Sequence, residues 1–250
     1  QTLLNTLRAQ WSQLLELDRF RREGVSNLSH DLRSPLTATA ASLETLQQRW
    51  RHEPARAADL QLVEVALRNT RNAAGLVRSL GDLALLDEPS FRLEPMLLDV
   101  AEVLDDITLR FAERAERQGI ALRHEAIGAE TAAAHIDIEL FERAVANLLD
   151  NALKFTPSGG HVTLTSQVDG TQVAVGVADS GSGIAAADMP RLFDRLYQAR
   201  ESTAPAAGDG GKGLGLAIVK RIAELHAGTV DVTSAPGRGT QVWIRLPRAV

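Results

Sequence analysis

Apolar side chains recur at spacings of three and four residues along the first third of the chain, and this pattern limits the fold more than any other feature. A first run extends from Leu4 to Trp50 and a second from Leu60 to Ala84. This spacing places the apolar groups on one stripe of an α-helix. Residues 1–88 are therefore predicted to form two long helices joined as a hairpin.

Two amphipathic helices bury little apolar surface by themselves, so the stripe needs a further partner. Pairing of two hairpins into a four-helix bundle covers it, and we predict a homodimer on this ground. Packing of the stripe onto the rest of the same chain is the alternative. Charges at Asp18 and Arg21 interrupt the stripe, which divides an N-terminal coiled-coil helix, residues 1–23, from the hairpin proper, residues 24–88.

A different pattern begins after Pro89 and Ser90. Helical periodicity and polar caps predict helices at Val100–Gln118, Asp137–Phe155 and Leu214–His226. Alternating or continuous apolar runs predict strands at Ile120–Ile127, Val162–Val168, Val173–Ala178, Thr229–Thr233 and Thr240–Leu246. Strands and helices mixed in this order predict an α/β sandwich over residues 89–250, rather than a doubly wound parallel sheet.

The composition excludes several classes of protein. With 44% hydrophobic and 24% charged residues among 250, the chain is typical of a folded globular protein. It has no cysteine, so disulfides and thiolate metal sites are excluded. The net charge of −5 argues against a nucleic-acid partner. No apolar run reaches the ~20 residues of a membrane-spanning helix.

Three polar residues, Asn147, Asn151 and Lys154, lie in the helix predicted at 137–155 among the apolar positions Val145, Leu148, Leu149, Ala152, Leu153 and Phe155. Their spacing of i, i+4 and i+7 places them on one face. The amide oxygen of Asn151 is a suitable hard ligand for Mg²⁺, and the Lys154 ammonium can contact the phosphates that Mg²⁺ bridges. The alternative is a solvated face of a surface helix.

Two glycine-rich segments follow this helix. Asp179 ends a predicted strand beside Gly181 and Gly183, where its carboxylate can accept a hydrogen bond from a buried amine such as that of adenine. The sequence GKGLGL at 211–216 precedes a helix, whose N-terminal N–H groups and dipole favour an anion. It matches neither a P-loop nor a dinucleotide fingerprint. The small residues at 204–211 suggest a mobile cover over the ligand.

The segment SHDLRSPL at 29–36 places His30 and Asp31 within the first helical run. A neutral imidazole carries one nucleophilic nitrogen. An adjacent carboxylate that accepts the proton of the other nitrogen activates it. A histidine followed by an acid is more often part of a solvated helix face, so this pair alone does not define a site.

The order of these motifs closely resembles the sensor histidine kinases. NLLDNALKFT at 147–156, DSGSGI at 179–184, FDRLY at 193–197, GKGLGL at 211–216 and GRGT at 237–240 resemble the motifs of their ATP-binding catalytic domain, and the string at 29–36 resembles their phosphoacceptor motif. The resemblance implies a Bergerat-type α/β sandwich with an ATP lid between Phe193 and Gly215. The residues that it implies for ATP binding are Asn147, Asn151, Lys154, Phe155, Asp179, Gly181, Gly183, Ile184, Phe193, Tyr197, Lys212, Gly213, Leu214, Gly215, Leu216 and Thr240, with Asn151 holding Mg²⁺. Leu196 departs from the family, which usually has an aromatic residue there.

The same resemblance implies the reaction. His30 is expected to accept the γ-phosphoryl group of ATP, with Asp31 as the activating acid, and to pass it to an aspartate of a separate response regulator. Lid charges such as Arg195, Arg200 and Lys212 would offset the phosphate charge. Ser34 stands where relatives have Thr or Asn for dephosphorylation of the regulator.

Two other functions share parts of this pattern: a dimer-clamping ATPase of the same nucleotide fold, and a non-catalytic scaffold that dimerises and docks a regulator. The phosphoacceptor string argues against the ATPase, and the intact nucleotide motifs argue against the scaffold. The chain opens at Gln1 inside a helical pattern. We therefore expect it to be the cytoplasmic part of a bacterial inner-membrane sensor, anchored by a segment upstream.

Overall fold

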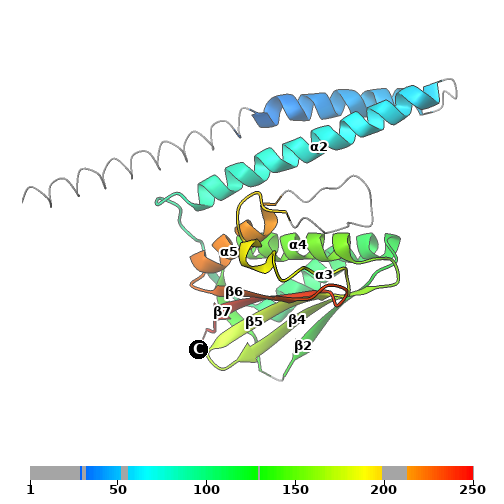
Figure 1. The fold of residues 1–250 in the computed structure, drawn as a ribbon. Coiled ribbons are helices and arrows are strands. Elements are labelled where there is room, and N and C mark those ends of the chain that lie inside the picture. Colours follow the sequence, from blue (N-terminus) through cyan, green and yellow to red (C-terminus); the bar gives the residue numbers. More distant parts are fainter. Residues whose placement is uncertain (1–28, 30–31, 52–55, 129, 199–212, 250) are drawn as a thin grey trace, which may run out of the picture. The chain divides into compact units, whose positions relative to one another are not determined.

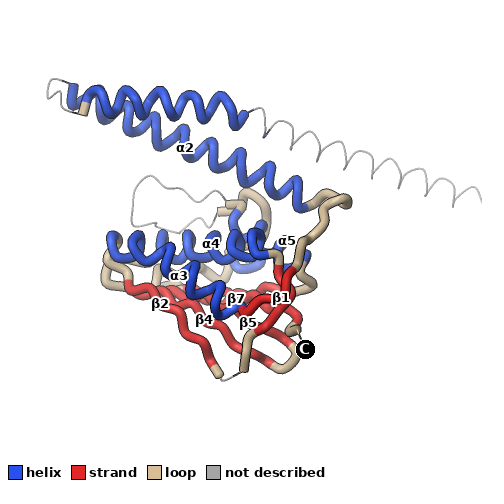
Figure 2. The backbone as a smooth tube through the Cα atoms, turned by 180° about the vertical axis from the view of Figure 1, so that it is seen from behind, coloured by secondary structure: helices blue, strands red, loops and turns tan. Residues whose placement is uncertain are grey.

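The computed structural model describes residue 29 and residues 32–51, 56–128, 130–198 and 213–249. The chain divides into two compact units, Gln1–Phe91 and Arg92–Val250, and each is considered by itself. Figures 1 and 2 show helices alone in the first unit and a sheet with helices in the second. The predicted order, a helical region followed by an α/β domain, is confirmed.

The first unit is a hairpin of two long helices, residues 32–50 and α2 (Ala57–Leu86). Figure 1 shows them side by side, and an ion pair of 2.7 Å joins Arg71 of α2 to Glu44 of the other helix. Near the open end a Cβ atom at Gly81 would lie 2.9 Å from the Cβ of Ser29. Glycine therefore permits close helix packing at the residue beside His30.

The second unit contains a five-stranded mixed sheet and a separate two-stranded sheet. Its elements are β1 (Met96–Asp99), α3 (Val100–Arg117), β2 (Ala121–Ile127), β3 (Ala133–Ile136), α4 (Ile138–Phe155), β4 (His161–Asp169), β5 (Gln172–Asp179), the 3₁₀ turn η2 (Met189–Arg191), α5 (Gly215–Leu225), β6 (Thr229–Ser234) and β7 (Thr240–Pro247). The larger sheet has the order β2-β4-β5-β7-β6, in which only β2 and β4 pair in parallel. The mixed sheet agrees with the predicted α/β sandwich.

The helices α3, α4 and α5 cover one face of the larger sheet, as both views show (Figures 1 and 2). Alternate strand residues point to that face and are fully buried, among them Leu164 of β4 and Ile244 of β7. Opposite them lie helix side chains such as Phe141, Leu149 and Ile218, each at most 2% exposed. One apolar layer between helices and sheet therefore forms the core.

Aspartates start two of these helices. The Asp99 carboxylate accepts a hydrogen bond from the Ala101 N–H at the start of α3, and the Asp137 carboxylate accepts one from the Leu140 N–H at the start of α4. Both satisfy N–H groups that have no partner within the helix. Among the described helices, none combines the length and the apolar character that crossing a membrane requires.

The small sheet of β1 and β3 was not predicted. Each strand has four residues, and β3 contains two alanines, which have little β-propensity. The antiparallel pairing of Met96 with Ile136 places the two strands together, and such a contact between distant segments leaves no local signal in the sequence.

A buried histidine joins the end of α5 to the start of α4. His226 is 7% exposed, its Nδ1 lies 2.8 Å from the carbonyl oxygen of Ile222, and its Nε2 lies 2.9 Å from the backbone nitrogen of Asp137. A carbonyl only accepts and a backbone N–H only donates. Nδ1 therefore carries the proton and Nε2 accepts, which defines a neutral tautomer.

Replacement of His226 by phenylalanine is expected to lower the free energy of unfolding by about 1–3 kcal/mol, because the Asp137 N–H loses its acceptor while the ring shape is kept. Urea unfolding measures this change. His135→Phe, at an exposed position of β3, is the matched control and should change stability by less than about 0.5 kcal/mol. Equal stability of the two variants would contradict a structural role for the imidazole nitrogens.

Candidate functional site

The polar face of α4 meets the first turn of α5. Asn147, Asn151 and Lys154 are all partly buried on α4, and the Asn147 amide donates to the Arg143 carbonyl at 2.9 Å. A Cβ atom at Gly215, the first residue of α5, would lie 3.3 Å from Asn147 Oδ1 and 3.8 Å from Asn151 Nδ2. The structure thus brings two separate predicted motifs together, and the small Gly215 permits their approach.

Asp179 ends β5, and its carboxylate is held by two backbone groups. Oδ1 accepts hydrogen bonds from the Gly181 N–H at 2.8 Å and from the Thr240 N–H at 3.2 Å. Among the residues that the structure describes, no group bonds the other oxygen, Oδ2. The carboxylate is therefore oriented by the protein, with one oxygen left to accept from a ligand.

Burial raises the pKa of the Asp179 carboxyl group above its ordinary value. The N–H groups of Gly181 and Thr240 and the nearby His161 act in the opposite direction and offset part of this rise. Burial acts in this way because the charged carboxylate loses solvation. A carboxyl group whose charge is unfavourable in the free protein is a candidate for a functional site, since a ligand donor can compensate it.

The loop after Asp179 packs against the end of α4. The Ser182 N–H donates to the Phe155 carbonyl at 3.3 Å. A side chain at Gly181 would overlap the same carbonyl. The Lys154 ammonium lies 4.9 Å from the centre of the Phe155 ring. The α4 motif and the Asp179 loop are therefore neighbours, although 24 positions separate Phe155 from Asp179 in the chain.

The segment at 193–197 follows η2 and lies next to the start of the α5 region. The Leu196 N–H donates to the Gly213 carbonyl at 2.7 Å, and Lys220 of α5 lies 5.8 Å from the centre of the Phe193 ring. The Tyr197 hydroxyl donates to Asp188. The predicted borders of the lid are thus in direct contact with each other.

Leu196, where the family usually has an aromatic residue, is 62% exposed and has a φ of +62°. Leucine rarely adopts this left-handed conformation, because its Cβ approaches the carbonyl oxygen. Of the neighbouring predicted residues, Leu214 is buried, Leu216 is partly buried and Arg195 is exposed. Leu214 therefore anchors the motif in the core, whereas Leu196 contributes little to packing.

Several predicted residues lie outside the described part of the chain: His30, Asp31, Arg200 and Lys212. Ser34 is described and is exposed on the helix of residues 32–50. Within the described residues, no group of three or more His, Asp or Glu side chains could hold a metal ion.

Sequence reasoning missed Ser234, the last residue of β6. Its hydroxyl lies 2.9 Å from the Ile184 nitrogen, 2.8 Å from the Gly239 carbonyl oxygen and 2.9 Å from Thr240 Oγ1. A serine at a strand end carries no distinctive pattern, so the sequence contains no signal for this role. The residue connects the Asp179 loop with the turn before β7.

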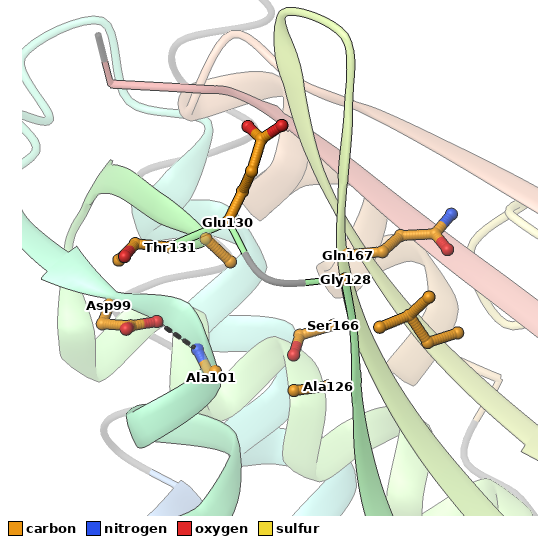
Figure 3. Close-up of a pocket in the computed structure, with 10 residues that line it drawn as sticks. Asp99, Ala101, Ala126, Gly128, Glu130, Thr131, Ser166 and Gln167 are labelled. Carbon is orange, nitrogen blue, oxygen red and sulfur yellow. Dashed lines mark hydrogen bonds between the residues drawn. The ribbon is translucent and has the colours of Figure 1, made fainter.

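A pocket of about 230 Å³ lies in another part of the domain, at the start of α3 (Figure 3). It is lined by Asp99, Ala101, Ala126, Ile127, Gly128, Glu130, Thr131, Ala132, Ser166 and Gln167. The view shows the Asp99 carboxylate directed at the Ala101 N–H, so this helix start already has its acceptor. None of the predicted site residues lines this pocket.

Two family models cover most of the chain. Residues 20–89 match the His Kinase A (phospho-acceptor) domain, and residues 136–250 match the histidine kinase-, DNA gyrase B-, and HSP90-like ATPase. The chain belongs to the sensor histidine kinases. The ATPase match of this histidine kinase contains the α4 face, the Asp179 loop and Thr240, and the phosphoacceptor match contains the string at 29–36.

Named relatives agree with this assignment. The histidine kinase is 33% identical over 240 residues to the sensor histidine kinase TmoS of Ectopseudomonas mendocina, covering 94% of this chain and 24% of the relative. It is 31% identical over 248 residues to the adaptive-response sensory kinase SasA of a Synechococcus species, covering 97% of this chain and 63% of the relative. The chain therefore spans only part of the length of these proteins.

Solved structures show the same fold. Full-length ShkA in complex with AMPPNP superposes with a TM-score of 0.71 and 26% identity, covering 91% of this histidine kinase and 46% of that chain. The histidine kinase AdeS of Acinetobacter baumannii superposes with a TM-score of 0.60 over 88% of this chain, at 20% identity. The second likeness concerns the fold alone.

Proposed function

We propose that this histidine kinase transfers the γ-phosphoryl group of ATP to His30 and then to an aspartate of a cognate response regulator. The observation that carries the proposal is the joining of a phosphoacceptor domain and an ATPase-type domain in one chain. The first supplies a nucleophile and the second a nucleotide site. A dimer-clamping ATPase has no use for the phosphoacceptor string, and a scaffold has no use for an oriented Asp179.

The base of ATP would bind at Asp179. Its Oδ1 is held by the N–H groups of Gly181 and Thr240, so Oδ2 can accept from the exocyclic amine of adenine. A hydrogen bond to a charged acceptor is stronger than a neutral one. Gly181 and Gly183 carry no side chains that would fill the space beside Asp179, and Ile184, which follows them, is partly buried. These contacts support adenine as the base.

The phosphates would bind between α4 and the start of α5. The N-terminus of α5 presents backbone N–H groups and the positive end of the helix dipole, and the Asn147–Asn151 face lies against it. Lys154 and Lys212 would add positive charge. Asn151 would hold Mg²⁺ through its amide oxygen, since Mg²⁺ prefers oxygen ligands and is commonly held by few protein groups together with phosphates. When bound, Mg²⁺ would neutralise part of the phosphate charge.

The transfer needs His30 in the neutral form. One imidazole nitrogen attacks the γ-phosphorus, the bond from that phosphorus to the bridging oxygen breaks, and ADP leaves with the electron pair. Asp31 would accept the proton of the other nitrogen and stabilise the charged ring. The second transfer moves the phosphoryl group from nitrogen to a carboxylate oxygen of the regulator. Ser34, one helical turn after His30, would position a water for dephosphorylation.

The homodimer and the regulator are part of the same proposal. In the single hairpin, Leu62 and Val65 are 70% and 44% exposed, which leaves apolar surface for a second copy in a four-helix bundle. The regulator would dock on the bundle near His30. We place the chain on the cytoplasmic side of a bacterial inner membrane, attached through an anchor outside this sequence.

The test is incubation with γ-labelled ATP and Mg²⁺, comparing the native protein with His30→Gln. Native protein should acquire label that is lost in acid and stable in alkali. The variant should lose more than about 95% of this label, because glutamine has no nucleophilic nitrogen to accept the phosphoryl group. His135→Gln is the matched control and should label normally. Label that persists in His30→Gln, or ATP hydrolysis without any label, would contradict the proposal; the latter would favour the ATPase. A parallel incubation with a chelator of Mg²⁺ tests whether labelling needs the metal, and it should abolish the label.

A further inference from the structure

The Ser234 hydroxyl lies where three segments of the nucleotide domain meet. Ser234 pairs with Thr240 at the end of the β6–β7 ladder. Its Oγ lies within hydrogen-bond distance of the Ile184 nitrogen, the Gly239 carbonyl oxygen and the Thr240 hydroxyl, at 2.9, 2.8 and 2.9 Å. One side chain therefore contacts the loop after Asp179 and the turn before β7.

The chemistry of these three partners fixes the direction of each hydrogen bond. A serine hydroxyl has one proton and two lone pairs. The Gly239 carbonyl can only accept, so it receives the Ser234 proton. The Ile184 N–H can only donate, so it occupies one lone pair of Ser234. The remaining contact must then have the Thr240 hydroxyl as donor, directed at the second lone pair.

Thr240 is consequently left with lone pairs alone for any further partner. Its own N–H is bonded to Asp179 Oδ1, so the two residues lie side by side at the ends of β5 and β7. The free oxygen of Asp179 is also an acceptor. The pair therefore offers two acceptors and no side-chain proton at the place where the base is proposed to bind.

We propose that Ser234 determines base specificity as a positioning residue, by holding the Thr240 hydroxyl as an acceptor. Two acceptors favour a purine with an amino group at position 6. They repel a purine with a carbonyl oxygen there, because acceptor faces acceptor without a proton between them. This inference rests on the proposed binding of ATP at Asp179, and it assigns a role to a residue that need not contact the nucleotide.

The variant Ser234→Ala releases the Thr240 proton, which can then turn toward a carbonyl oxygen of the base. ITP has a carbonyl oxygen at position 6 and a proton on N1, whereas ATP has an amino group at position 6 and no proton on N1. The ratio of the dissociation constants of ITP and ATP is expected to fall by about ten-fold, the effect of one reoriented hydrogen bond at position 6. Isothermal titration of the whole chain with each nucleotide and Mg²⁺ measures this ratio. Ser234→Thr keeps the hydroxyl and should restore it.

Ser166→Ala is the control, because it removes a buried hydroxyl that bonds His124 at 3.0 Å on another strand. This variant should keep the native ratio. An equal loss of affinity for ATP and ITP in Ser234→Ala would overturn the inference, since a purely structural hydroxyl acts on both alike.

The variant Thr240→Val provides a second test that does not depend on the folding of Ser234→Ala. It removes the hydroxyl whose direction Ser234 sets and keeps the side-chain shape, and the ratio should again fall. An unchanged ratio of the ITP and ATP dissociation constants in this variant would overturn the inference. Failure of the native protein to bind either nucleotide would instead refute the proposed function, and with it the role of Ser234.

Discussion

Asp179→Asn is expected to weaken ATP binding by about ten- to a hundred-fold while raising the melting temperature of the nucleotide-free protein. The loss corresponds to one hydrogen bond to a charged group, about 1.5–3 kcal/mol. The gain arises because burial makes the charged carboxylate unfavourable. Asparagine carries no charge, and its Oδ1 can still accept from the Gly181 and Thr240 N–H groups.

The difference in melting temperature between the variant and the native protein should depend on pH, and the raised pKa of Asp179 gives the direction. Because the pKa of Asp179 is raised in the folded state, its protonated form favours folding, and this contribution is lost as the pH rises through the folded pKa. Above the folded pKa the native protein therefore bears the unfavourable charge and the variant does not. The difference in melting temperature should shrink as the pH falls toward 3.8, the ordinary value.

Calorimetric titration with Mg·ATP and thermal unfolding at several pH values measure the two effects. Asp169→Asn is a suitable control, since it changes an exposed aspartate at the end of β4 in the same domain and should alter neither ATP binding nor the melting temperature. A variant of Asp179 that binds ATP normally would remove the basis for the base site. A lower melting temperature at pH 7 would show that the carboxylate is needed for folding instead.

Gly239→Ala is expected to prevent folding of the nucleotide domain, with a cost of more than about 4 kcal/mol. Gly239 has a φ of +75°, and a Cβ atom there would overlap the carbonyl oxygen of Asp179. The carbonyl cannot move away, since Asp179 and Thr240 are paired in the β5–β7 ladder. The expected result is insoluble protein or the loss of a cooperative urea transition in this domain.

Gly237→Ala, two residues earlier in the same turn, allows the cost of the left-handed backbone to be separated from the cost of the overlap with Asp179. Gly237 has a φ of +71°, but no atom lies within 4 Å of a Cβ placed there. The variant should lose only about 1–2 kcal/mol, the cost of a left-handed alanine. Equal losses in the two variants would indicate that backbone conformation, rather than the contact with Asp179, makes glycine necessary.

Periodicity was sufficient to predict the long elements of this protein. The apolar stripe of α4, its Asp137 cap and its polar face could be read from the sequence because they depend on spacing within one helix. The sheet strands could be read for the same reason, since alternation is local. The order of pairing, with β7 between β5 and β6, could not, because hydrogen bonds between distant strands leave no local pattern.

The sequence indicated many of the residues that form the site, but it did not indicate the hydrogen bonds that join them. Asp179 was identified from its place at a strand end, but one of its two backbone partners is Thr240, which lies 61 residues away. Ser234 was missed because its role exists only when β6 and β7 pair. The left-handed conformation of Leu196 was likewise invisible, since leucine normally avoids it.

The bond between His226 and Asp137 has a mechanical consequence for the two helices that it joins. It links the end of α5 to the start of α4, whereas the opposite end of α5, Gly215, faces Asn147. The same two helices also pack against each other between these points, so a change at the His226 end can be transmitted to the Gly215 end through that packing. A substitution of His226 is therefore expected to alter the distance between Gly215 and Asn147 without changing either residue.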